Sequence, residues 1–310
     1  MFLPARRERF NKYKKAKNQK KINVKVILFI VFLLITIFVL LFGFSHFRKE
    51  SKITIVSREK SGDVLVINFD RSASKITTVR IPGDTEVEVA RQLGAWRLKS
   101  VWQLGLNEKI GGRLLATTII KNFHFPVFAW TDSLGAGLAS DSASSILKAV
   151  VIPYDTNLGF GDKVRLALFS LGVKNIDRQE INLGKSSYLR ETNLKDGERG
   201  YEIFGQIPEK LLPVFYDPYL AQKEAKIVII NTSGEARLSS MLGAILRTLG
   251  GQVVAIFERN ETDINCEISG NDSLIEYKIN LLLDCRKSKV EPEGNYDFQI
   301  IIGKEFAERF

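Results

Sequence analysis

One uninterrupted apolar run constrains this chain more than any other feature. Residues 26–44 read VILFIVFLLITIFVLLFGF, nineteen residues without a charge, in which Thr36 carries the only hydroxyl group. As an α-helix rising about 1.5 Å per residue, the run would span about 28 Å, close to the hydrocarbon thickness of a bilayer. A cleaved signal peptide has a shorter apolar segment followed by small residues, whereas here Ser45-His46-Phe47-Arg48-Lys49 follows. The sequence therefore predicts one uncleaved transmembrane helix over 26–46 that contacts the lipid bilayer.

The distribution of charge predicts the orientation of this helix. The 310-residue chain has a formal net charge of +10, and residues 1–25, with ten Lys/Arg and one Glu, account for +9 of it. Cations concentrate on the cytoplasmic side of a membrane span. We therefore expect a cytoplasmic basic tail over 1–25 and an extracytoplasmic remainder, in a single-pass protein of the cell membrane. Because that remainder is nearly neutral, nucleic acid is not an expected partner.

The residues after the apolar run have the pattern of a mixed α/β chain. Segments rich in Val and Ile predict strands, and apolar residues at helical spacing predict helices. The predicted strands include 51–59, 63–69, 75–81 and 125–131, and the predicted helices include 88–106, 111–123 and 162–172. The pattern leaves open whether residues 130–220 form a separate unit.

The last part of the chain shows a strand–helix–strand pattern. Residues 226–231 and 252–257 predict strands, and the helix between them ends at Gly250-Gly251. A unit of about thirty residues with this pattern favours parallel pairing of its two strands. The expected fold is α/β: the transmembrane helix, an extracytoplasmic domain over 47–222, and a small α/β domain over 223–310.

The two cysteines of the chain, Cys266 and Cys285, lie in this last domain. In an oxidising compartment such a pair favours a structural disulfide, here between the third strand and the end of the second helix. The spacing is not that of a redox-active Cys-x-x-Cys pair. Free thiols are the alternative.

Four charged residues flank strand ends of the first predicted domain and are candidate catalytic residues: Asp63, Arg80, Asp84 and Arg97. Carboxylates suit Mg²⁺ and arginines suit a pyrophosphate, so Asp63 or Asp84 would hold the metal. Asp84 and Arg97 are the candidate ligand-binding residues. The alternative is a set of solvated charges at strand ends. The chain has only two histidines, His46 and His124, which gives little support to a Ser/His/Asp triad or a histidine-rich zinc site.

Several segments resemble a known family. The order of basic tail, span and SGDVLVINFDRSASKITTVRIPGDTEV (61–87) resembles the LytR-CpsA-Psr (LCP) family, whose Ile-Pro-Arg-Asp-Thr motif is similar to residues 81–85. Arg97-Leu98-Lys99 and Gly111-Gly112 are similar to the family's Lys-Ile-Asn and Gly-Gly motifs. Residues 226–257 and the closing DFQIIIGKEF (297–306) resemble the LytR C-terminal domain.

The resemblance implies an enzyme that transfers a glycopolymer phosphate from a polyprenyl-pyrophosphate carrier to peptidoglycan, using Mg²⁺, aspartates and arginines. The sequence departs from that pattern where the chemistry lies. Gly83 stands at the family's arginine, and Gly62 stands at its early aspartate, which leaves Asp63 one residue late. A shift of one residue along a strand turns a side chain to the opposite face.

We therefore expect a non-catalytic, LCP-like binding or scaffold module for wall glycopolymer or envelope assembly, with peptidoglycan or a polyprenyl-linked glycopolymer as partner. No cofactor is expected unless the site is active, in which case Mg²⁺ is. One alternative is an active glycopolymer phosphotransferase that uses Asp63, Arg80, Asp84 and Arg97. The other is a membrane-tethered regulator of the envelope.

Overall fold

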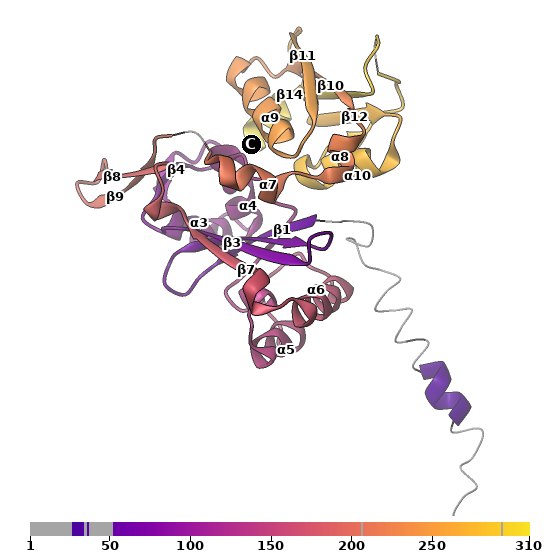
Figure 1. Cartoon of the computed structure of the whole chain (residues 1–310). Helices are drawn as coiled ribbons and strands as arrows, with labels where there is room; N and C mark the ends of the chain where they lie inside the picture. The colour runs from indigo at the N-terminus through magenta and orange to yellow at the C-terminus, as the bar shows by residue number, and fades with distance from the viewer. Residues whose placement is uncertain (1–26, 34–35, 37–51, 206, 293) are drawn as a thin grey trace, which may run out of the picture.

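A computed structural model of the chain describes residues 27–33, 36, 52–205, 207–292 and 294–310 (Figure 1). Within these ranges no helix has both the length and the apolar content needed to cross a membrane. The predicted fold with a transmembrane helix over 26–46 is therefore corrected. The rest of that prediction, and the predicted tail 1–25, lie outside the described residues.

A five-stranded sheet in the order β6-β1-β2-β3-β7 forms the centre of the first unit. The strands β1 (Lys52–Arg58), β2 (Val64–Asp70) and β3 (Lys75–Ile81) are antiparallel neighbours, which confirms the strands predicted there. The edge strands β6 (Ala129–Thr131) and β7 (Arg178–Asn182) run parallel to β1 and β3. Because β7 lies beside β3, part of the segment 130–220 belongs to this sheet.

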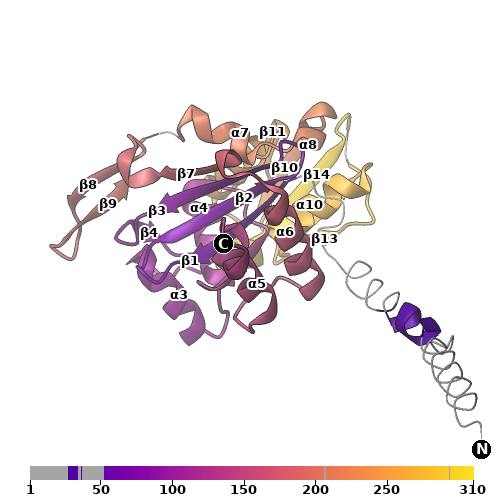
Figure 2. The same ribbon diagram turned by 60° about the horizontal axis from the view of Figure 1, so that its bottom comes forward.

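Helices cover both faces of the sheet. Figure 1 shows α5 (Ala143–Val151) and α6 (Phe160–Gly172) on one side, and α4 (Arg113–Phe123) and α7 (Leu212–Phe215) on the other. Figure 2, seen from the α5 and α6 side, places these two helices in front of the strands. The central strands β1 and β2 are buried almost along their whole length, as expected for strands covered on both faces.

The helix predicted over 88–106 is wrong in its first half. Residues Glu86–Glu88 and Ala95–Arg97 pair as the antiparallel strands β4 and β5, and the helix α3 covers only Leu98–Asn107. The backbone explains the difference, since Gly94 has a φ of +80° and Arg91 and Gln92 are also left-handed. An α-helix cannot pass through such residues. The remaining elements of this unit are η1 (Gly135–Ala139), η2 (Asn175–Asp177), η3 (Leu183–Lys185), β8 (Leu189–Asn193), β9 (Arg199–Ile203) and η4 (Glu209–Leu211). The short helix α8 (Pro218–Gln222) lies against the C-terminal unit (Figure 1), where the hydroxyl group of Tyr219 donates to Asp272.

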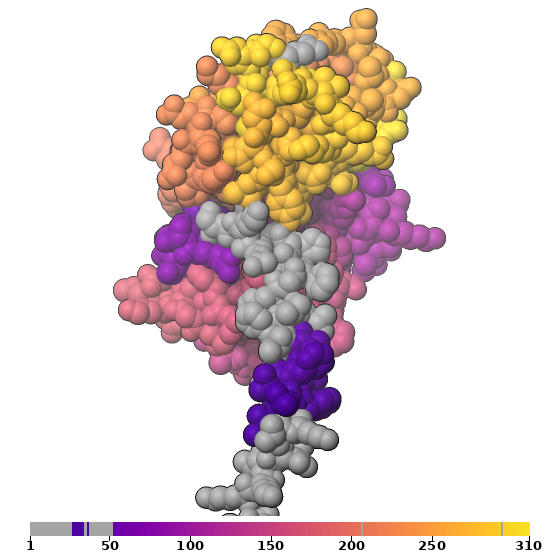
Figure 3. Space-filling view, turned by 90° about the vertical axis from the view of Figure 1, so that its right-hand side faces the viewer, coloured from indigo at the N-terminus to yellow at the C-terminus, as the bar shows by residue number. Residues whose placement is uncertain are grey.

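A second five-stranded sheet, in the order β11-β10-β14-β12-β13, forms the C-terminal unit. The predicted strand–helix–strand unit is confirmed as β10 (Lys226–Thr232), α9 (Ala236–Thr248) and β11 (Gln252–Glu258), with the two strands parallel. The other elements are β12 (Cys266–Gly270), α10 (Ser273–Leu283), β13 (Arg286–Lys287), β14 (Phe298–Gly303) and α11 (Lys304–Arg309). Figure 3 shows these residues, orange to yellow, packed against the first unit.

Two cross-links stabilise the C-terminal unit. A disulfide joins Cys266 of β12 to Cys285 just after α10, with the Cα atoms 4.4 Å apart. A buried ion pair joins α10 to the segment that precedes the sheet: Lys278 Nζ lies 2.6 Å from Asp217 Oδ2, and the two side chains are 2% and 4% exposed. The other carboxylate oxygen of Asp217 accepts hydrogen bonds from the backbone N–H groups of Tyr219 and Leu220, and thereby caps α8.

We expect Asp217→Asn to lower the free energy of unfolding by about 3 kcal/mol or more, because it removes the buried carboxylate that Lys278 contacts. Asparagine keeps an oxygen that can cap α8, so this variant isolates the charge. Asp217→Ala removes both contacts and should be less stable still. Urea unfolding of the full-length chain measures both variants, and equal stability of Asp217→Asn and wild type would contradict the expectation.

Candidate functional site

Asp63 and Arg80 meet beside the ends of β2 and β3. Asp63 precedes β2 and Arg80 lies in β3, where it pairs with Leu65. Arg80 Nη1 contacts Glu59 and lies 3.3 Å from Asp63 Oδ2, while Arg80 Nε donates to Glu180 Oε1 at 2.7 Å. The hydrogen bond with Glu180, and then that with Glu59, raise the pKa of Arg80, whereas its partial burial acts in the opposite direction. One guanidinium is thus shared by three carboxylates.

Asp84 and Arg97 form a second cluster, on the other side of the loop 82–84 that follows β3. Arg97 lies at the end of β5, and its Nη1 donates to Asp84 Oδ1 at 2.8 Å. It also binds both carboxylate oxygens of Asp196, at 2.8 and 3.0 Å, and lies 3.4 Å from Glu198. Asp196 and Glu198 belong to the turn between β8 and β9, so Arg97 ties that hairpin to the sheet unit.

The charges of this cluster lower the pKa values of its carboxyl groups. Lys99 Nζ lies 2.6 Å from Asp84 Oδ1, and the hydrogen bonds from Lys99 and then Arg97 lower the pKa of Asp84. The hydrogen bonds from Arg97, and then from the backbone N–H of Glu198, lower the pKa of Asp196 to about 2. These carboxylates are ionised at neutral pH and are paired with cations of the chain itself.

Gly83 lies between the two clusters. Its N–H donates to Asp63 Oδ1 at 3.0 Å, and its carbonyl oxygen accepts from the backbone N–H of Lys99 at 2.8 Å. A Cβ atom at this position would lie 2.3 Å from the carbonyl oxygen of Gly62 and 3.0 Å from Lys99 Cβ. The position at which the LCP resemblance places an arginine is therefore filled by backbone, and no side chain fits there unless the loop moves.

The four predicted residues thus form two pairs that flank residues 82–84. The structure brings Asp63 to Arg80 and Asp84 to Arg97, and none of the ion pairs among the described residues joins one pair to the other. Three cations face six carboxylates in the two clusters: Arg80, Arg97 and Lys99 against Glu59, Asp63, Asp84, Glu180, Asp196 and Glu198. This excess of negative charge disfavours a bound pyrophosphate.

The same contacts do not fit a Mg²⁺ ion. One oxygen of Asp63 accepts from Gly83 and the other faces Arg80, while Oδ1 of Asp84 contacts Arg97 and Lys99. A metal ion bound to these oxygens would have to displace Arg80, Arg97 and Lys99 or the N–H group of Gly83. Across the part of the chain that the structure describes, no group of three or more His, Cys, Asp or Glu side chains is arranged to hold a metal.

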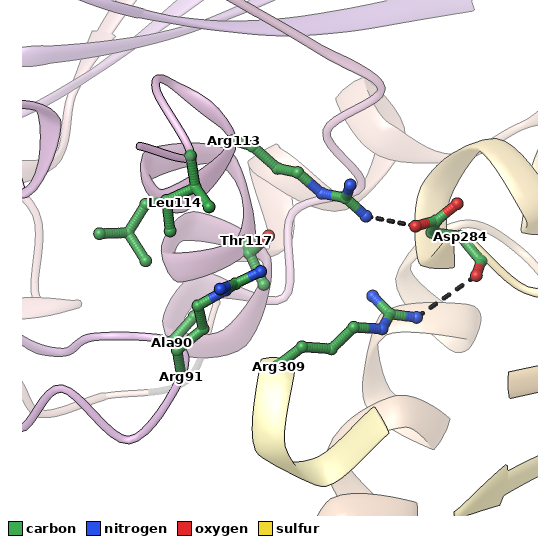
Figure 4. A pocket seen from close by; sticks show the side chains of 8 residues that line it. Ala90, Arg91, Arg113, Leu114, Thr117, Asp284 and Arg309 are labelled. Atoms are coloured by element: carbon green, nitrogen blue, oxygen red, sulfur yellow. Dashed lines mark hydrogen bonds and ion pairs between the residues drawn. The ribbon is translucent and has the colours of Figure 1, made fainter. Parts of the chain in front are cut away.

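Several hollows lie elsewhere, between α4 and the C-terminal unit. One of about 680 Å³ is lined by residues that include His124, Met241 and Phe310, and one of about 370 Å³ by residues that include Ile120, Trp130 and Leu282. A third, of about 140 Å³, contains Arg113, Asp284 and Arg309 (Figure 4). The sequence did not predict that the residues of this third hollow come together. Arg113 and its partner Asp284 are 171 positions apart, and no motif or spacing connects them.

No family model and no curated protein matches this chain. It is similar to a solved structure of TagT from B. subtilis, with 12% identity and a TM-score of 0.37 over 50% of this chain and 85% of the other. It is also similar to B. subtilis TagV, with 10% identity and a TM-score of 0.38 over 65% of this chain and 98% of the other. A third similar structure is the "LytR-CPS2A-psr family protein YwtF (TagT) with bound octaprenyl pyrophosphate lipid". It has 11% identity and a TM-score of 0.37 over 64% of this chain and 91% of the other. The family name of this structure agrees with the family predicted from residues 61–87. The LytR-type C-terminal domain stays a prediction.

We expect Arg97→Gln to lower the urea midpoint of unfolding at pH 7, because three carboxylates would then face one another without their shared guanidinium. The variant should also change the acid response. Arg97 lowers the folded-state pKa of Asp196 to about 2 from an ordinary value of 3.8. Ionised Asp196 therefore stabilises the fold above pH 3.8, and this contribution is lost as the pH falls towards 2. In Arg97→Gln that part of the pH dependence should be smaller.

The matched control is Arg199→Gln in the neighbouring strand. The Arg199 side chain is 84% exposed and lies 4.0 Å from Glu191, so its loss should leave the midpoint unchanged. Equal midpoints for the two variants would show that the Arg97 cluster does not stabilise the fold.

Proposed function

We propose that this protein is a non-catalytic module of the cell envelope, which binds a wall glycopolymer or an envelope partner without transferring a phosphoryl group. The resemblance of residues 61–87 to the LCP family supports the glycopolymer as ligand class. One observation carries the non-catalytic part of the proposal. Gly83 replaces the arginine of the resembling motif, and the carbonyl oxygen of Gly62 lies where its side chain would begin.

The electrostatics of the two clusters support the same conclusion. Phosphoryl transfer depends on cations aimed at the phosphate oxygens, where they stabilise the charge of the transition state. Arg80 and Arg97 instead point at carboxylates from their own unit. A pyrophosphate would have to displace these contacts and would meet the exposed carboxylates left behind.

The proposed location is outside the cytoplasm. The disulfide between Cys266 and Cys285 supports it, because structural disulfides persist in oxidising compartments and are rare in the cytosol. We propose that the C-terminal unit, which resembles the LytR C-terminal domain, contributes to the contact with polymer or partner.

The full-length protein should show no Mg²⁺-dependent transfer of glycan from a polyprenyl-pyrophosphate donor to peptidoglycan, above a control without protein. Binding of the glycan should be retained in a pull-down on immobilised polymer. Transfer that requires Mg²⁺ and is abolished by Asp84→Ala would overturn the proposal and identify an active phosphotransferase. Loss of both transfer and binding would contradict the glycopolymer assignment.

Replacement of Gly83 tests the closed loop directly. Gly83→Ala should lower the free energy of unfolding by about 1–3 kcal/mol, because the added Cβ overpacks against Gly62 and Lys99. Gly83→Arg should be less stable still and should not create transfer activity. The control is Gly172→Ala at the end of α6, where an added Cβ meets nothing within 4 Å, so its stability should stay within about 1 kcal/mol of wild type. A stable and active Gly83→Arg variant would contradict the steric argument.

A further inference from the structure

The pocket of about 140 Å³ between the two units is lined by side chains that carry more positive than negative charge. Figure 4 shows its charged residues: Arg91 in the turn between β4 and β5, Arg113 at the start of α4, Arg309 at the end of α11, and Asp284 just after α10. We propose that this pocket binds an oxyanion of the phosphate class. The inference does not depend on the proposed function, because the pocket shares no residue with the Gly83 loop.

The three arginines are unequally compensated. Arg113 Nη2 contacts Asp284 Oδ2, the one acidic side chain that lines the pocket. Arg309 donates to neutral acceptors, namely Asn265 Oδ1 at 2.6 Å and the carbonyl oxygen of Leu283 at 2.5 Å. Within the described ranges Arg91 makes no hydrogen bond or ion pair. The pocket therefore carries a net charge of about two positive units, opposite to that of the Gly83 clusters.

Burial and neighbouring charges both act on Arg309. Its pKa is lowered to about 10, first by burial and then by the charges of Arg113 and Arg91, although Asp284 acts in the opposite direction. An anion placed among the three guanidinium groups would offset both the burial and the mutual repulsion.

The chemistry of the lining favours phosphate over other anions. Guanidinium groups present paired N–H donors that match two oxygens of a phosphate, and three of them suit a group with several anionic oxygens. The Thr117 side chain also lines the pocket and adds a hydroxyl donor. Ala90 and Leu114 form apolar parts of the wall.

Backbone conformation explains how two of these residues reach the pocket. Arg91 and Asp284 are non-glycine residues with φ values of 64° and 55°, in the left-handed region. Asp284 takes this conformation as the C-cap of α10, and Arg91 takes it in the turn between β4 and β5. Here they present the free cation and the acid to the same pocket.

The pocket has room for more than the anionic group. The neighbouring hollow of about 370 Å³ shares Arg113, Asp284 and Arg309, and extends along apolar side chains that include Ile120 and Leu282. A phosphate ester could therefore place its phosphoryl group among the arginines and its organic part in this hollow. Since Arg91 and Arg113 belong to the first unit and Arg309 to the second, the bound anion would bridge them.

The test is calorimetric titration of the full-length protein with inorganic phosphate, glycerol 1-phosphate and diethyl phosphate, at an ionic strength matched with chloride. Tighter binding of the first two compounds would identify free phosphate or a monoester as the source, and tighter binding of the third would identify a phosphodiester of a polymer. Either result supports the phosphoryl site. No phosphate binding beyond the chloride-matched background would overturn the proposal.

Variants at the turn between β4 and β5 distinguish the pocket from general surface attraction. Arg91→Asn removes the charge and, because asparagine tolerates the left-handed region, should raise the phosphate Kd about tenfold or more. Gln92→Asn makes a matched change at the next left-handed residue, keeps Arg91, and should leave the Kd unchanged. If the two variants bind phosphate equally, the proposal is wrong.

A change at Arg113 supplies a second measurement. Arg113→Gln should weaken binding, whereas Arg113→Lys should restore part of it, because lysine keeps the charge and loses the paired donors. Arg309 has a structural role as well, because it donates to the carbonyl oxygens of Leu283 and Asp284 at the end of α10, so Arg113 is the better position for this test.

Discussion

The contact between the backbones of Gly62 and Gly83 determines the arrangement of the predicted site. The two glycines approach so closely that a Cβ on Gly83 would lie 2.3 Å from the carbonyl oxygen of Gly62. This approach places the N–H of Gly83 on Asp63 and its carbonyl oxygen on the N–H of Lys99. The loop is thereby held between the two carboxylate–arginine clusters, and its backbone occupies the space in which a cationic side chain would meet a ligand.

The two charged regions of the molecule use arginine in opposite ways. At the Gly83 loop, Arg80 and Arg97 each contact three carboxylates, so their charge is used within the chain. At the pocket between the units, three arginines line the wall with one aspartate, whose carboxylate contacts only Arg113. Because attraction of an anion depends on the charge that remains after internal pairing, the second region is the better candidate for an anionic ligand although it lies outside the predicted motif.

The sequence predicts this fold best where the pattern is local. The strands of the first sheet and the strand–helix–strand unit follow from runs of Val and Ile, and the structure confirms them. The helix expected over 88–106 is wrong because apolar spacing does not reveal that Arg91 and Gln92 take left-handed conformations. The transmembrane helix was predicted from a run of which the structure describes only a part, and no membrane-spanning helix is found in that part.

The candidate site, too, is predicted only as far as neighbouring strands determine it. Asp63, Arg80, Asp84 and Arg97 lie at or near strand ends, so their pairing follows from the antiparallel registers of β2 with β3 and of β4 with β5. Their other partners come from distant segments: Glu180 from β7 and Asp196 from the turn between β8 and β9. Those carboxylates make the net charge of the two clusters negative, and no spacing within residues 61–99 predicts that they lie there. The function of such a site therefore depends on tertiary contacts, which decide whether an arginine is available to a ligand.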